Sequence, residues 1–234
     1  MKQLKSILYV AEASIAPGPA MARAVSLAEN NQADLTVVDV VPVVTAGICM
    51  PPGGPISTDL QSAMVSKRLS ELESLVAPYQ HARDIKIEVL VGQMFLEVIR
   101  AVLRNKYDLV IKPAGNPDFI ERLFGSSDMQ LLRMCPCQVW LTGPDEKSKY
   151  VRILAAVDFN LDRLSGLVEE SLNQQILELA SSLALPDFAE LHFIHVWDAP
   201  AEMMVQLWAD NPDEASKTYV EGVRSRHERA FHRL

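Results

Sequence analysis

The sequence predicts an α/β protein with a doubly wound, five-stranded parallel sheet, followed by a partial second copy of the same domain. Two observations support this fold class. Five short apolar runs alternate with segments whose apolar residues recur at helical spacing. The same pattern then begins again in the last third of the chain. Strands that are apolar throughout and are joined by helices pair in parallel, with helices over both faces of the sheet.

Each predicted strand of the first domain is a run of four to seven residues rich in Val, Ile or Leu. The strands are expected at 6–11, 35–41, 85–91, 109–112 and 138–142. The intervening segments carry their apolar residues on one helical face. They predict helices at 20–29, 60–75, 95–103 and 127–134.

The second half of the chain repeats the beginning of the first. Residues 5–12, Lys-Ser-Ile-Leu-Tyr-Val-Ala-Glu, align with residues 151–158, Val-Arg-Ile-Leu-Ala-Ala-Val-Asp. Residues 33–40 align with residues 189–196, at an offset of 156 in place of 146. The repeat therefore predicts the first two strands of a second domain, with an insertion between them.

A polar, turn-rich joint at 143–147 separates the two copies. We therefore expect a complete domain at 1–145 and a partial second domain at 148–234, which ends within its second helix. The first strand of that partial domain is expected to lack a neighbour on one side, which leaves backbone groups unpaired. Residues 148–234 are thus expected to be marginally stable unless a partner or the first domain covers that edge.

Composition excludes several classes of function. The net charge is −8 and no cluster of Lys and Arg occurs, so a nucleic-acid partner is not expected. No apolar stretch is long enough for a signal peptide or a membrane span, so no membrane partner is expected. Three cysteines, an odd number, fit a reducing compartment, which predicts a cytoplasmic protein.

The segment between the fourth strand and the next helix carries the pattern most specific for chemistry. Gly115 is followed, after nine residues, by Gly125 and Ser126, and the helix expected at 127–134 comes next. Glycines let the backbone approach phosphate oxygens, amide N–H groups can point at them, and a helix N-terminus adds its positive end. Ser126 supplies either a hydroxyl donor or a helix N-cap. The pattern predicts a phosphate-binding loop.

This loop, in register with Pro136-Cys137 before the last strand, resembles that of the universal stress protein family. The resemblance covers residues 5–143 fully and 151–234 partially. It implies a flavodoxin-like, adenine nucleotide alpha hydrolase-like fold. A lysine at the position of Lys112, in a first domain that a second domain follows, resembles the tandem E-type members of the family. In those members the second copy tends to carry the better nucleotide loop. Here the second copy is expected to lack that loop.

The resemblance also implies a set of nucleotide-binding positions. Glu12 stands where the family commonly has an Asp that contacts the adenine or ribose region. Val40 occupies a position whose backbone often touches adenine. The remaining candidates belong to the loop and are Lys112, Gly115, Gly125 and Ser126. No catalytic residue and no metal ligand is assigned.

The loop departs from the family pattern in ways that weaken a phosphate site. Lys112 stands where ATP-binding members have their first glycine, so a side chain replaces a close backbone approach. Pro113 and Pro117 supply no N–H donor. We therefore predict a degenerate site with no certain cofactor, at which ATP binds weakly if at all.

The last strand, 138–142, is the expected pairing surface, because universal stress proteins pair through this strand. Its Val139-Trp140-Leu141 core suits a homodimer or a tandem pseudo-dimer. The predicted function is a universal stress response protein that is not an enzyme and acts through domain pairing. Two alternatives stay open: an ATP-binding switch with slow hydrolysis, and a regulatory docking module.

Three further features have simpler interpretations. Cys135-Pro136-Cys137 could be a redox or metal pair, but two thiols cannot complete a zinc site, and we interpret them as packing at a helix-to-strand turn. His195, on the second strand of the second copy, is interpreted as structural. Met203 to Leu207 is expected to be core filler or a loop that packs on a partner.

Overall fold

The computed structural model describes residues 4–12, 18–44, 54–80, 84–114, 127–143, 149–159 and 167–234. The chain divides into two compact units, formed by residues 3–148 and by residues 149–234. Each unit is described by itself. In the described part of the chain, no helix combines the length and the apolar character needed to cross a membrane.

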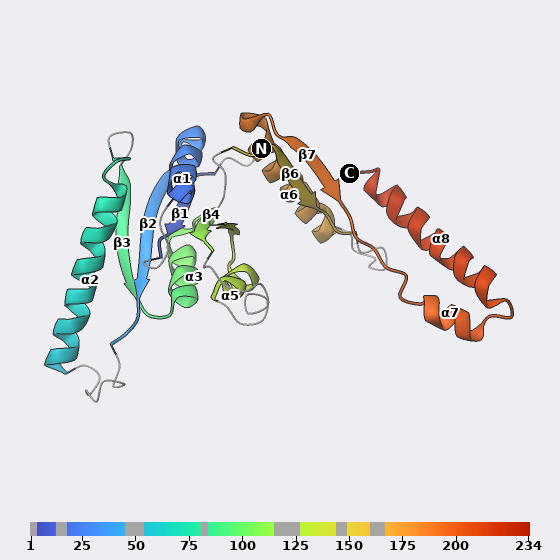
Figure 1. Ribbon diagram of the computed structural model, residues 1–234, viewed down its shortest axis with the longest axis horizontal. Helices are drawn as coiled ribbons and strands as arrows, with labels where there is room; N and C mark the ends of the chain where they lie inside the picture. Colours follow the sequence, from blue (N-terminus) through green and yellow to red (C-terminus); the bar gives the residue numbers. More distant parts are fainter. Residues whose placement is uncertain are drawn as a thin grey trace. The chain divides into compact units, whose positions relative to one another are not determined.

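The unit of residues 3–148 contains the predicted five-stranded parallel sheet (Figure 1). Its strands are β1 Ser6–Val10, β2 Asp34–Val41, β3 Ile85–Val91, β4 Leu109–Pro113 and β5 Gln138–Thr142. Their order in the sheet is β3-β2-β1-β4-β5, and all four pairs are parallel. The α/β, flavodoxin-like fold class is confirmed.

Helices cover both faces of this sheet (Figure 1). They are α1 Gly18–Asn31, α2 Pro55–Val76, α3 Met94–Asn105 and α5 Ser127–Met134. Alternate residues of each strand point to opposite faces. Ile7 and Tyr9 of β1 therefore pack with α1 and α2, whereas Leu8 and Val10 pack with α3 and α5.

The unit of residues 149–234 begins with the same β-α-β pattern. Its elements are β6 Arg152–Ala156, α6 Leu167–Asp187, β7 Glu190–Ile194, α7 Glu202–Trp208 and α8 Pro212–Phe231. β6 and β7 pair in parallel and form a two-stranded sheet. That this unit is an incomplete second copy of the family domain stays a prediction.

The expectation that Met203 to Leu207 fill a core or form a loop was wrong, whereas packing of these residues on a partner stays a prediction. These residues belong to the helix α7, not to a loop. Met203, Met204 and Leu207 are exposed, so they do not fill a core in this unit. The error has a physical cause, since a short apolar run does not reveal whether anything covers it.

Candidate functional site

The candidate site lies at the carboxyl ends of β1 and β4, where the strand order of the sheet reverses. In doubly wound sheets this reversal opens a crevice between the loops that leave the two strands. Glu12 follows β1, Lys112 lies near the end of β4, and Asp128 stands in the first turn of α5. Three elements that are distant in the sequence therefore meet at one point.

The ammonium group of Lys112 is the centre of this site. The side chain is only 2% exposed, which is rare for lysine unless the charge is paired. Its Nζ lies 2.5 Å from Oε2 of Glu12, 3.0 Å from Oδ1 of Asp128 and 3.0 Å from the carbonyl oxygen of Pro113. An ammonium group has three N–H donors, and the three acceptors account for all of them.

This arrangement opposes an anion at the start of α5. The first turn of a helix normally attracts a phosphate through free N–H groups and the positive end of the dipole. Here Asp128 already brings a carboxylate to that turn. Glu12 and Asp128 share the ammonium group of Lys112, so the charges of these three residues sum to −1. A phosphate group that accepts from the Lys112 ammonium would have to displace at least one of its present partners.

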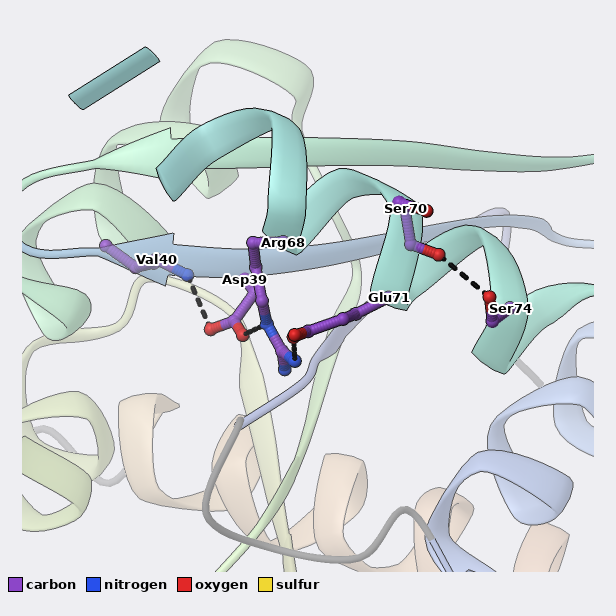
Figure 2. A network of polar contacts seen from close by, with 6 residues as sticks. All are labelled: Asp39, Val40, Arg68, Ser70, Glu71 and Ser74. Carbon is purple, nitrogen blue, oxygen red and sulfur yellow. Dashed lines mark hydrogen bonds and ion pairs between the residues drawn. The ribbon is translucent and has the colours of Figure 1, made fainter. Parts of the chain in front are cut away.

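The surroundings of Val40 are also internally paired, as Figure 2 shows. The backbone N–H of Val40 donates to Oδ1 of Asp39 at 2.6 Å. The other oxygen of Asp39 accepts from the Arg68 guanidinium of α2, which also donates to Glu71 at 2.6 Å. At the position whose backbone the resemblance relates to adenine, the N–H group is therefore engaged by a neighbouring side chain.

Asp39 and Arg68 form a largely buried ion pair, with 10% and 15% of their side-chain surfaces exposed. Burial raises the pKa of Asp39 above its ordinary value, although the Val40 amide and Arg68 lower it. Burial also opposes the charge of Arg68, but hydrogen bonds to Glu71 and Asp39 hold its pKa above the ordinary value. The guanidinium is thus committed to this network.

The structure brings together some of the predicted residues and leaves others undescribed. Glu12 and Lys112 are in direct contact, and Val40 is the last residue but one of the neighbouring strand β2. Gly115, Gly125 and Ser126 lie outside the described residues, as does Pro117. Their predicted role in a phosphate loop stays a prediction.

Sequence reasoning missed Asp128, Asp39 and Arg68 as parts of the site. Asp128 had a visible signal, because an acidic residue two positions after Ser126 falls in the first turn of the expected helix. Asp39 had one as well, as a charged residue inside an otherwise apolar strand. Arg68 had none, because nothing local distinguishes it from other polar residues of a long helix.

The corresponding end of the second unit is held by different contacts. Asn173 of α6 donates to the carbonyl of Asp158 at 2.7 Å and accepts from its amide at 3.1 Å. The ring of His195 contacts the carbonyl of Val157 at 3.1 Å and the ring of His227 at 2.8 Å. His195 thus ties β6, the chain after β7 and α8 together, as its structural interpretation expects. The partner His227 was not foreseen.

No group of three or more His, Cys, Asp or Glu residues in the described ranges is placed to hold a metal ion. The described part of the site holds a paired lysine and two carboxylates.

Comparisons with known proteins agree with this picture of the fold. The family model described as Universal stress protein family matches residues 3–143. Universal stress protein E of Photorhabdus laumondii is 27% identical over 241 residues, which cover 97% of this chain and 72% of the relative. The protein of the same name from Escherichia coli K12 is 24% identical over 176 residues. The matched region spans 53% of that relative's length, about half.

A solved structure shows the same fold over most of the chain. The putative universal stress protein from Pseudomonas aeruginosa UCBPP-PA14 aligns with a TM-score of 0.62 and 21% sequence identity. The alignment covers 94% of this chain and 70% of the solved one.

Proposed function

Since this chain belongs to the universal stress protein family, we propose that it is a non-enzymatic, cytoplasmic stress-response protein that acts through domain pairing. Its own nucleotide site is closed from within. The observation that carries the proposal is the buried ammonium of Lys112, held by Glu12 and Asp128 where the resemblance places a nucleotide. The pairing surface is the edge strand β5.

A nucleotide phosphate could pair with Lys112 only by displacing one of its present partners, and this displacement costs free energy. Removing one partner from a buried ion pair costs about 3–5 kcal/mol, because a charge is left uncompensated. A nucleotide phosphate that displaces Glu12 or Asp128 pairs with Lys112 in its place, and Glu12 is 36% exposed, so only a part of this cost is subtracted from the binding free energy. Each 1.4 kcal/mol is a factor of about ten in affinity, so binding is expected to weaken by about tenfold or more.

Titration calorimetry with ATP and Mg²⁺ tests the closed site. The wild-type chain should give no heat of binding at micromolar nucleotide, and a fresh preparation should carry no nucleotide by mass spectrometry. The double variant Lys112→Gly, Asp128→Ser removes both blocking side chains and should bind ATP more tightly than the wild type. Lys86→Ala is the matched control, because it removes one lysine from β3 without touching the site.

Two results would contradict the closed site. Micromolar binding by the wild type, or copurified ATP, would favour the alternative of an ATP-binding switch with slow hydrolysis. A double variant that binds no better than the wild type would show that Lys112 and Asp128 are not what closes the site.

The assignment of the pairing surface rests on a contrast between the two edges of the sheet. Edge strands present unpaired N–H and C=O groups, and charged side chains protect them from pairing. The edge strand β3 carries Lys86 and Glu88, whereas β5, Gln-Val-Trp-Leu-Thr, has no charged residue. β5 is hydrogen-bonded to β4 on one side, and the described residues provide no strand on its other side. A second copy of β5 is the occupant we propose.

Light scattering coupled to gel filtration tests this pairing. The wild type should elute with twice the chain mass of 26.0 kDa. Leu141→Lys places a charge on the β5 edge and should give a monomer, whereas Glu88→Lys, a charge change on β3, should leave the dimer intact. A monomeric wild type would contradict pairing between chains and would leave tandem pairing within a chain as the alternative.

A further inference from the structure

Two cysteines meet at the turn between α5 and β5. Cys135 follows the last residue of α5, and Cys137 directly precedes β5. Their Sγ atoms are 3.6 Å apart, and both side chains are free thiols of intermediate exposure. They pack against the apolar cluster on the α3 and α5 face, as the packing interpretation expects. Packing by itself does not require the two sulfur atoms to be in contact.

The surroundings of the two thiols are unequal. The hydrogen bond between the two thiols and the one from the backbone N–H of Cys137 lower the pKa of Cys135 to about 7, although burial opposes this. The hydrogen bond with Cys135, burial and the negative charge of Asp108 raise the pKa of Cys137. The C-terminal end of α5 disfavours a thiolate at Cys135, but this effect is smaller than that of two direct donors. Cys135 is therefore the nucleophile of the pair.

We propose that Cys135 and Cys137 form a dithiol that hydrogen peroxide oxidises reversibly to an intramolecular disulfide. The Cys135 thiolate attacks one oxygen of the peroxide, the O–O bond breaks, and the released hydroxide takes up a proton to become water. Cys135 is now a sulfenic acid. The Cys137 sulfur then attacks the Cys135 sulfur, the S–S bond forms, the S–O bond breaks, and a second water leaves with the Cys137 proton. Two thiols lose two electrons, and one peroxide is reduced to two waters.

The geometry favours this second step. A disulfide requires the sulfur atoms to approach to about 2.0 Å, so the present separation of 3.6 Å must shorten by about 1.6 Å. Rotation about the two side-chain bonds supplies a displacement of this size. A zinc site is not an equal alternative, because the described residues provide no third ligand near the pair. An external dithiol returns the pair to its reduced state by thiol–disulfide exchange.

The test uses the full chain and a single diagnostic peptide. Trypsin cleaves after Arg133 and Lys147, and the peptide Met134–Lys147 contains both cysteines but not Cys49. After peroxide treatment this peptide should be lighter by two hydrogen atoms and should resist alkylation. Dithiothreitol should restore both properties. Met134→Leu is the control for methionine oxidation within the same peptide, and Cys49→Ser is the control for disulfides to the third cysteine.

Variants of each cysteine separate the two roles. Cys137→Ser should trap the sulfenic acid on Cys135, which dimedone labels, whereas Cys135→Ser should give no dimedone label. At pH 7 a thiol of pKa 7 has about fifty times the thiolate of a thiol of pKa 9, and its lower intrinsic nucleophilicity removes most of that gain. The folded chain should therefore react about fivefold faster than the free peptide Met134–Lys147.

The pH dependence of alkylation gives an independent readout in the Cys49→Ser chain. The rate at Cys135 should be fully developed above pH 7 and lost as the pH falls through about 7. Cys137→Ala removes the thiol donor and should move this midpoint upward, whereas Cys137→Ser keeps a hydroxyl donor and should move it less. The charges that act on Cys137 among the described residues are those of Cys135 and Asp108, and Asp108 stays unchanged in all of these variants.

Three results would overturn the proposal. One is a peptide Met134–Lys147 that keeps two alkylatable thiols under peroxide. Another is equal reactivity of the folded chain and the free peptide. A third is a sulfenic acid in Cys135→Ser but not in Cys137→Ser, which would reverse the assigned roles.

Discussion

The two β-α-β segments of this chain have matching sequences but different burial. In β1, the four residues from Ile7 to Val10 are buried, whereas only Ala155 is buried in β6. Leu8 and Leu154 occupy aligned positions at an offset of 146, and they are 0% and 66% exposed. In both segments the first strand pairs in parallel with the second, β1 with β2 and β6 with β7.

The difference lies in what surrounds each segment. β1 is hydrogen-bonded to β2 on one side and to β4 on the other, with helices over both faces. Among the described residues of the second unit, β6 pairs with β7 alone. A local pattern is therefore sufficient to form a strand, but burial of that strand depends on elements much further along a chain.

The largest expected effect compares Leu8→Ala with Leu154→Ala. The first removes a fully buried side chain and should cost about 2–5 kcal/mol of unfolding free energy. The second alters an exposed side chain and should stay within about 0.5 kcal/mol. Hydrogen exchange of peptides from each unit reports the two values separately. A large cost for Leu154→Ala would mean that β6 is covered in solution, which would break the comparison.

An intermediate effect is expected for Asn173→Ala in the second unit. Asn173 is buried, and its amide pairs with both backbone groups of Asp158. Its loss leaves two backbone groups without that partner and should cost about 1–3 kcal/mol. Exchange protection of β6 measures this cost. Gln174→Ala is the control, since its contact to Glu178 is exposed and its loss should leave β6 protection unchanged.

The smallest effects are expected for alanine substitutions at two glycines, which should change the free energy of unfolding in opposite directions. Gly92 has φ of 151°, and an added Cβ would lie 2.7 Å from Cγ of Glu97, so Gly92→Ala should destabilise by about 1 kcal/mol or more. Gly222 lies inside α8 with no atom near an added Cβ, so Gly222→Ala should stabilise by about 0.5–1 kcal/mol. Thermal unfolding gives both signs. Destabilisation by Gly222→Ala would indicate that this face of α8 is in contact with a partner.

In the candidate site, too, the sequence identified residues, whereas the contacts between them were seen only in the structure. Sequence reasoning found Glu12, Lys112 and the family position of Val40. It treated Lys112 as a group that weakens a phosphate loop, whereas the structure shows a buried cation that is held by two carboxylates. The lysine was visible in the sequence, but the direction of its side chain was not.

In the unit of residues 3–148, the sequence by itself determined the order of the described elements and several of their bounds. β3, β5 and α5 have the predicted bounds residue for residue. The spacing of apolar residues shows which side of a helix or strand is apolar, and a few consecutive residues are enough to reveal it. These elements therefore needed no knowledge of the rest of the fold.

Only the tertiary structure decided which residues meet. Lys112 and Glu12 are 100 residues apart, and His195 and His227 are 32 apart. The exposure of Met203, Met204 and Leu207 in α7 was equally hidden. Contact, burial and ion pairing depend on the strand order and on what covers each face, and no short stretch of sequence specifies either of them.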